Sequence, residues 1–211
     1  MTRVNVYSAM HKAQRKRMFD LASDMGRADF EDTATVNRLR ADLERIIANL
    51  REHAQYEENF VHPLFAEAGA AAQEPLQTFH DEHNALEVLL EEIETHAKTN
   101  FDAKLYADIN RLIATYLIHI DKEETAQESL LWPNFDDARM AGVMETARLN
   151  TSPPQAMENL RFMLPCLSVA EATGFLLAAK ATAPAPAFQA VCEVAQQIMP
   201  ADEWAIISAK L

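Results

Sequence analysis

The chain has 211 residues, of which 49% are hydrophobic and only four are glycine, and its formal net charge is −13 at pH 7. Such a negative charge disfavours binding to nucleic-acid phosphates and to anionic membrane surfaces. No segment approaches the roughly 20 consecutive apolar residues that span a bilayer, so we expect neither a nucleic acid nor a membrane as partner. The two cysteines lie far apart and the N-terminus lacks the apolar run of a signal peptide, which predicts a cytoplasmic protein with free thiols.

Four segments of the first 135 residues carry apolar side chains at steps of three and four, the pattern of helices that pack against a core. These stripes run from Val4 to Met25, from Val36 to Leu64, from Leu76 to Ile93 and from Leu105 to Glu123. The breaks between them are short, and Asp102 before the fourth stripe is typical of a helix N-cap. We therefore predict an all-α fold, an up-down-up-down antiparallel four-helix bundle with a C-terminal helical extension.

The character of the chain changes after the fourth segment, so we predict a bundle over residues 1–136 and an extension over residues 137–211. The extension has many small and apolar residues, little charge and proline-containing breaks, which predict a series of shorter helices. No chemical motif stands out in it. We expect it to pack on the bundle, on a second copy in a homodimer or on a protein partner.

One short pattern occurs twice on the stripes of the second and fourth segments. His53 is followed four residues later by Glu57 and then Glu58, and His119 by Glu123 and then Glu124. Residues four apart share a helix face, so each pair can present an imidazole and a carboxylate to one metal ion. A buried unpaired carboxylate is costly. Because the stripes offer no Lys or Arg as its partner, a metal site is favoured over a structural polar network.

The other two stripes also contain histidines, His11 on the first and His83 on the third. If the second and third helices fold back on each other near residue 70, His83 lies level with Glu57, so we predict both histidines to be ligands. His80 precedes His83 by three residues. This spacing is equally typical of a second ligand and of a hydrogen-bond partner to a ligand.

Three further residues near the repeated pattern are not among the predicted metal ligands. His62 lies nine residues after His53, about 180° around an ideal helix, and we interpret it as a helix-end residue. Glu58 and Glu124 point about 100° away from the preceding glutamates, so we predict that they are solvated, with hydrogen bonding to the site as the lesser alternative.

Imidazole and carboxylate ligands in a helix bundle suit iron, manganese or zinc, and the absence of a nearby cysteine disfavours a structural zinc–thiolate centre. A carboxylate can also bridge two metal ions, as in the di-iron bundles. An apolar wall is expected beside the site; it comprises Leu50, Leu86, Leu112 and Tyr116.

In these motifs the chain resembles the hemerythrin-like, or His-His-Glu cation-binding, family over about residues 1–136. The resemblance implies a non-haem di-iron centre bridged by two carboxylates and an oxo or hydroxo group. It also implies roles for individual residues: terminal ligands His11, His53 and His119, bridging carboxylates Glu57 and Glu123, and His83, with His80, as the contribution of the third helix.

Two departures from the oxygen-carrying members narrow the expected function. Those proteins have His-x-x-x-His on the third helix and His-x-x-x-x-Asp on the fourth, where this chain has His80-x-x-His83 and His119-x-x-x-Glu123. These two departures point away from simple oxygen carriage and towards a protein that senses or reacts with O₂, NO, peroxide or iron. The alternatives are a di-iron oxidase or peroxide-consuming enzyme, and a metal-free helical scaffold or interaction protein.

Overall fold

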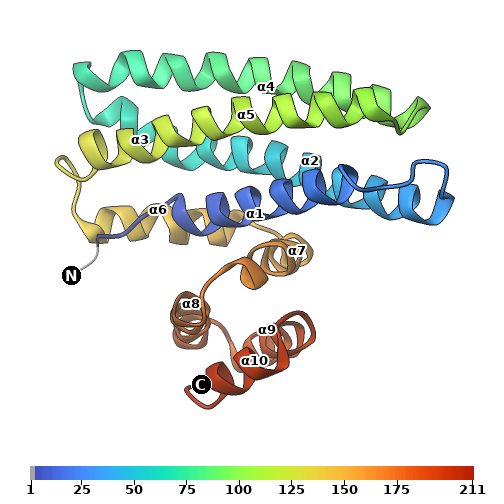
Figure 1. Cartoon of the computed structure of the whole chain (residues 1–211). Coiled ribbons are helices and arrows are strands. Elements are labelled where there is room, and N and C mark those ends of the chain that lie inside the picture. Colours follow the sequence, from blue (N-terminus) through green and yellow to red (C-terminus); the bar gives the residue numbers. More distant parts are fainter. Residues whose placement is uncertain (1–2) are drawn as a thin grey trace. The chain divides into compact units, whose positions relative to one another are not determined.

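The computed structural model describes residues 3–211, and among them every regular element is a helix, which confirms the all-α class (Figure 1). The described chain forms two compact units. The first comprises residues 3–8 and 14–147, and the second residues 9–13 and 148–211. The helix α1 (Ser8–Met25) runs without a break through residues 9–13.

Four long helices make up most of the first unit and lie side by side in Figure 1: α1, α2 (Thr33–Tyr56), α4 (Gln73–Thr99) and α5 (Ala103–Ala126). Aspartate side chains begin two of them. Asp32 accepts hydrogen bonds from the backbone N–H groups of Ala34 and Thr35, and Asp102 accepts one from Leu105, as its sequence position predicts. Between α3 (His62–Glu67) and the short η2 (Ala70–Ala72), Gly69 adopts φ 97°, which favours glycine.

Two of the long helices end in a π-helical turn, η1 (Glu57–Val61) after α2 and η3 (Gln127–Leu131) after α5. A π turn closes on a hydrogen bond from residue i+5 to residue i, one residue more than an α turn. Each turn is followed by a proline, Pro63 or Pro133, whose ring clashes with the carbonyl four residues earlier in a regular α-helix. Widening the preceding turn relieves that clash, and it changes which residues face the core.

The position of His62 depends on the first of these turns. The backbone N–H of His62 donates to the carbonyl of Glu57, so the two residues lie one full turn apart on the same helix face. The side chain of His62 is only 3% exposed. The expectation that His62 points away from the site is therefore wrong, because it assumed a regular α-helix through residues 57–62.

An apolar cluster fills the first unit beside these turns. Phe65 and Phe79 pack edge to face, with ring centroids 5.4 Å apart, and Val61 and Leu131 of the π turns are fully buried with them. Met140 of α6 (Asp137–Asn150) belongs to the same cluster. Full burial of side chains of this size contributes about 1.5–3 kcal/mol each. This packing holds the ends of α2 and α5 in place.

The second unit contains the remaining helices, α7 (Pro153–Met163), η4 (Leu164–Cys166), α8 (Val169–Thr182), α9 (Ala185–Ile198) and α10 (Ala201–Ser208). A capping box of Ser168 and Glu171 begins α8. The unit buries apolar side chains such as Phe162, Leu176 and Ile207. Within the described chain, no helix combines the length and apolar character needed to cross a membrane.

Candidate metal centre

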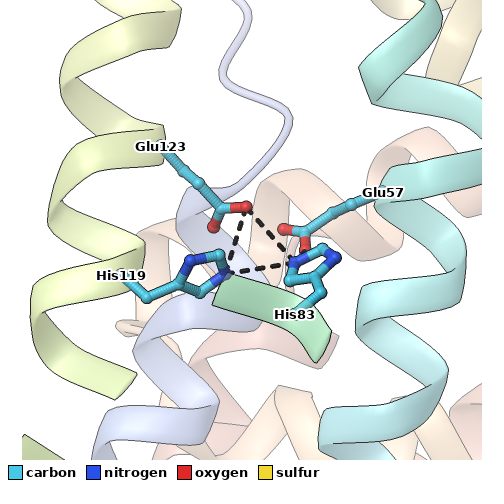
Figure 2. Close-up of side chains that lie close together, drawn as sticks. All are labelled: Glu57, His83, His119 and Glu123. Carbon is cyan, nitrogen blue, oxygen red and sulfur yellow. Dashed lines mark hydrogen bonds and ion pairs between the residues drawn. The ribbon is translucent and has the colours of Figure 1, made fainter. Parts of the chain in front are cut away.

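Four buried side chains from three helical segments converge in the first unit (Figure 2). Glu57 comes from the start of η1, His83 from α4, and His119 and Glu123 from α5. Glu57 and Glu123 are 1% and 0% exposed. One potential ligand atom of each of the four residues lies within 4.8 Å of those of the others.

His83 is central to this four-residue cluster. Its Nε2 atom lies 3.1 Å from Nε2 of His119, 3.3 Å from Glu57 Oε2 and 3.7 Å from Glu123 Oε1 (Figure 2). His119 Nε2 in turn lies 3.3 Å from Glu123 Oε1. Two imidazole nitrogens and two carboxylates thus face one point, where a cation would reduce the repulsion between them.

Two further carboxylates fix the orientation of the imidazole rings. Glu58 Oε1 lies 3.1 Å from Nδ1 of His83, and Glu82 Oε2 lies 3.0 Å from Nδ1 of His119. Lys122 forms an ion pair with Glu82. With a metal ion bound, a proton on each Nδ1, donated to its carboxylate, would leave the Nε2 lone pairs directed at the centre.

The two glutamates that follow the repeated pattern are therefore not simply solvated. The side chain of Glu58 is 43% exposed and still contacts the ring of His83. Glu124 accepts hydrogen bonds from both terminal nitrogens of Arg15, at 2.8 and 2.9 Å. Both interactions are made with other helices, so the spacing along one helix does not reveal them.

A second group of potential ligands consists of His11, His53 and Glu57, whose ligand atoms also lie within 4.8 Å of one another. His53 Nε2 is 2.9 Å from Glu57 Oε1. His11 precedes Gln14 by about one turn of the continuous helix α1. Gln14 donates to Asn49 Oδ1 at 3.0 Å, which fixes the rotation of α1 about its axis. Glu57 thus belongs to both groups.

Six of the seven residues predicted as ligands, all except His80, fall in these two groups. The ring of His80 instead packs edge to face on His62, with centroids 4.8 Å apart. His62 also stacks on His83 at 5.4 Å. Sequence spacing did not associate His62 with the site, and Pro63 was the available signal because it widens the preceding turn.

The pKa values near the cluster reflect a surplus of negative charge. Burial lowers the pKa of His83, but its hydrogen bonds to Glu123 and Glu57 outweigh burial and raise that pKa to about 10. Burial, with Glu57 beside it, raises the pKa of Tyr56 to about 12. The pKa of fully buried Tyr7 is also raised, first by burial and then by Glu123 and Glu57. The cluster therefore favours a bound cation and disfavours further negative charge.

A small cavity of about 30 Å³ adjoins the histidines, between α2, α4 and α5. His53, His83 and His119 line it together with apolar side chains: Leu50, Leu86, Leu90, Leu112 and Tyr116. Because a water needs roughly 10–15 Å³ by this measure, the space suits two waters or one diatomic molecule. The expected apolar wall lies in this lining.

The donor set fits a pair of transition-metal ions. All six donor residues are buried and offer imidazole nitrogen or carboxylate oxygen, the mixture that suits iron, manganese or zinc. The shared Glu57 allows each of two ions to have its own histidines. Among the described residues both cysteines, Cys166 and Cys192, lie outside the two groups.

Comparison with known proteins agrees with this fold and site. The family model described as the hemerythrin HHE cation binding domain matches residues 2–144. The chain belongs to the hemerythrin HHE cation-binding family, which confirms the resemblance seen in its motifs. Comparisons with curated proteins and with solved structures gave no match.

Proposed function

We propose that the chain binds two iron ions among its long helices and uses them to sense or react with O₂, NO, peroxide or the iron supply itself. The observation that supports this most strongly is the position of Glu57 in two groups of buried nitrogen and oxygen donors. The proposed scaffold is an antiparallel up-down-up-down bundle. Its support is the short connections and the course of the four long helices in Figure 1.

In this proposal each side chain has a defined task. His83, His119, Glu123 and Glu57 would hold one ion, and His11, His53 and Glu57 the other. A bound iron pair supplies reversible electron transfer to a small ligand. Glu58 and Glu82 keep the two imidazoles oriented, so that their Nε2 atoms remain available at the centre.

The cavity beside the histidines supports a small ligand. Leucine side chains form much of its lining, and they exclude bulk water while leaving space for a diatomic molecule. The Glu123 carboxylate stands four residues after His119, where oxygen carriers have an aspartate one residue later. This difference favours sensing or reaction over reversible carriage. A partner protein or a second copy, bound through the second unit, would receive the signal.

Anaerobic loading of the metal-free protein with Fe²⁺, followed by metal analysis, tests the proposal. We expect two irons per chain in the native protein and loss of iron in Glu57→Ala and His119→Ala. His96→Ala is the matched control, because His96 lies on α4 outside both groups and bonds Asp102. A native chain that takes up no iron would refute the proposal.

A second measurement separates a sensor from an enzyme. The iron-loaded protein is supplied with a reductant and with O₂ or peroxide, and consumption is followed over many equivalents. A sensor should react stoichiometrically and stop. Sustained turnover would instead favour an oxidase or a peroxide-consuming enzyme.

A further inference from the structure

His62 is a buried polar side chain for which the two ligand groups give no role. It is 3% exposed, and neither of its ring nitrogens has a hydrogen-bond partner among the described residues. Burial of unpaired nitrogen atoms costs free energy, so a side chain in this state indicates that a ligand or a water completes it. A histidine placed only for packing would be replaced by an apolar residue without this cost.

The neighbours of His62 form a row of imidazoles that leads inward. On one side lies the half-buried His80, whose ring centroid is 4.8 Å from that of His62 and whose ring plane is nearly perpendicular to it, at 87°. On the other side lies His83, whose ring centroid is 5.4 Å from that of His62 and whose ring plane is nearly parallel to it, at 18°. His83 turns its Nε2 atom towards Glu57 and His119 in the buried cluster. His62 therefore stands between a side chain that reaches solvent and the proposed metal centre.

We propose that His62 and His80 form an additional, weak site for a divalent cation, through which metal ions pass from the surface to the buried cluster. This inference rests on the proposed metal binding by the cluster. Imidazole nitrogen binds ions such as Fe²⁺, Co²⁺ and Zn²⁺, and water would complete the ligand shell. Two imidazoles bind such an ion less tightly than the larger set of charged donors beyond them, so the ion is passed inward.

The charge of the chain favours the approach of cations. The chain carries a net charge of −13, which concentrates cations at its surface. The cavity beside the cluster is lined by Glu57 and by the ion pair of Arg51 with Glu87, so its charge does not decide the route of a cation. The row of imidazoles supports the route past His80 and His62, because it offers nitrogen ligands between the surface and the cluster.

The test follows the uptake of Co²⁺ alone by the metal-free full-length chain, with visible absorption for the rate and calorimetric titration for the number of ions bound. His80→Gln removes the outer imidazole, and His62→Phe keeps a ring between Phe79 and His83. His96→Gln on the same helix is the control. We expect both test variants to fill the cluster about tenfold more slowly and to lose one weak equivalent, whereas the control is unchanged.

Three outcomes would overturn the inference. Uptake by His80→Gln at the native rate, with the weak equivalent retained, would show that no ion uses the pair. A lower final occupancy of the cluster at an unchanged rate would make His80 a ligand of the cluster instead. Loss of the weak equivalent in His96→Gln as well would place that binding elsewhere. A native chain that binds no Co²⁺ at the cluster would contradict the proposed function itself, so the two failures are distinguishable.

Discussion

Replacing His83 by glutamine and replacing Glu57 by glutamine should affect the metal-free protein very differently, although both changes should abolish metal binding at the cluster. With its pKa raised to about 10, His83 is positively charged at pH 7. It lies 3.3 Å from Glu57 and 3.7 Å from Glu123. The imidazolium thus acts as an internal cation between two buried carboxylates when no metal ion is bound.

The expected change in the free energy of unfolding depends on which buried charges remain after each substitution. His83→Gln leaves two buried carboxylates without the cation between them, and such a loss costs about 3–5 kcal/mol. Glu57→Gln leaves the imidazolium with Glu123 at 3.7 Å and Glu58 at 3.1 Å, so no buried charge loses all its partners and the free energy of unfolding should fall by less than in His83→Gln. For a chain of this length the first change lowers Tm by about 10 °C.

Urea and thermal unfolding of the chelator-treated protein at pH 7, followed by helical circular dichroism, measure both changes. Iron content of the same preparations supplies the second readout. Glu57→Gln should combine a smaller loss of stability with lost iron, which separates the binding role of this side chain from any structural role. Equal destabilisation by the two substitutions would refute the assignment of His83 as the internal cation.

Further predictions concern pH, ring orientation and a buried hydrogen bond. The raised pKa of His83 contributes stability that is fully present below about pH 6.5 and is lost as the pH rises towards 10. The urea concentration at half-unfolding should therefore fall over this pH range in the native protein, and His83→Gln should reduce that fall. Burial, with His83 nearby, lowers the pKa of His62 to about 4, so the stability linked to its neutral form is present above about pH 6.5 and is lost as the pH falls towards 4. His62→Phe should remove this loss of stability at acid pH, measured by urea unfolding. Glu58→Gln should weaken iron binding about 10- to 100-fold in competition titrations while two irons still bind at saturation; unchanged affinity would contradict the orienting role. Tyr116→Phe removes the donor to Gln14 Oε1 at 2.8 Å, which should cost about 1–3 kcal/mol in urea unfolding; native stability would show that this bond contributes nothing.

The periodicity of the sequence was sufficient for the helices and for the local ligand pairs. A stripe at steps of three and four places His53 and Glu57 on one face, and His119 and Glu123 likewise, whatever the helices pack against. The N-cap at Asp102 was predictable for the same reason, because it involves residues only three apart. His83 followed from one further assumption, the fold-back of α4 on α2.

The features that the sequence did not reveal depend on a local irregularity or on distant residues. His62 faces the core because a π turn before Pro63 adds one residue to the helix, and periodic analysis assumes regular α-helix. Glu58 and Glu82 orient histidines on other helices, 25 and 37 residues away along the chain. Such contacts depend on the rotation of each helix about its own axis, which packing decides.

The amino-acid sequence by itself therefore determined which side chains share a helix face, since neighbours on a helix are fixed by its 3.6-residue turn. The family resemblance implied bridging roles for Glu57 and Glu123. The tertiary structure decided that, of these two, Glu57 is the one in both ligand groups, and that His80 packs against His62 outside both. These arrangements join residues of different helices, and the sequence alone does not fix how far each helix is shifted along its axis or rotated about it. Packing of the apolar cluster sets both, and with them the position of every donor atom.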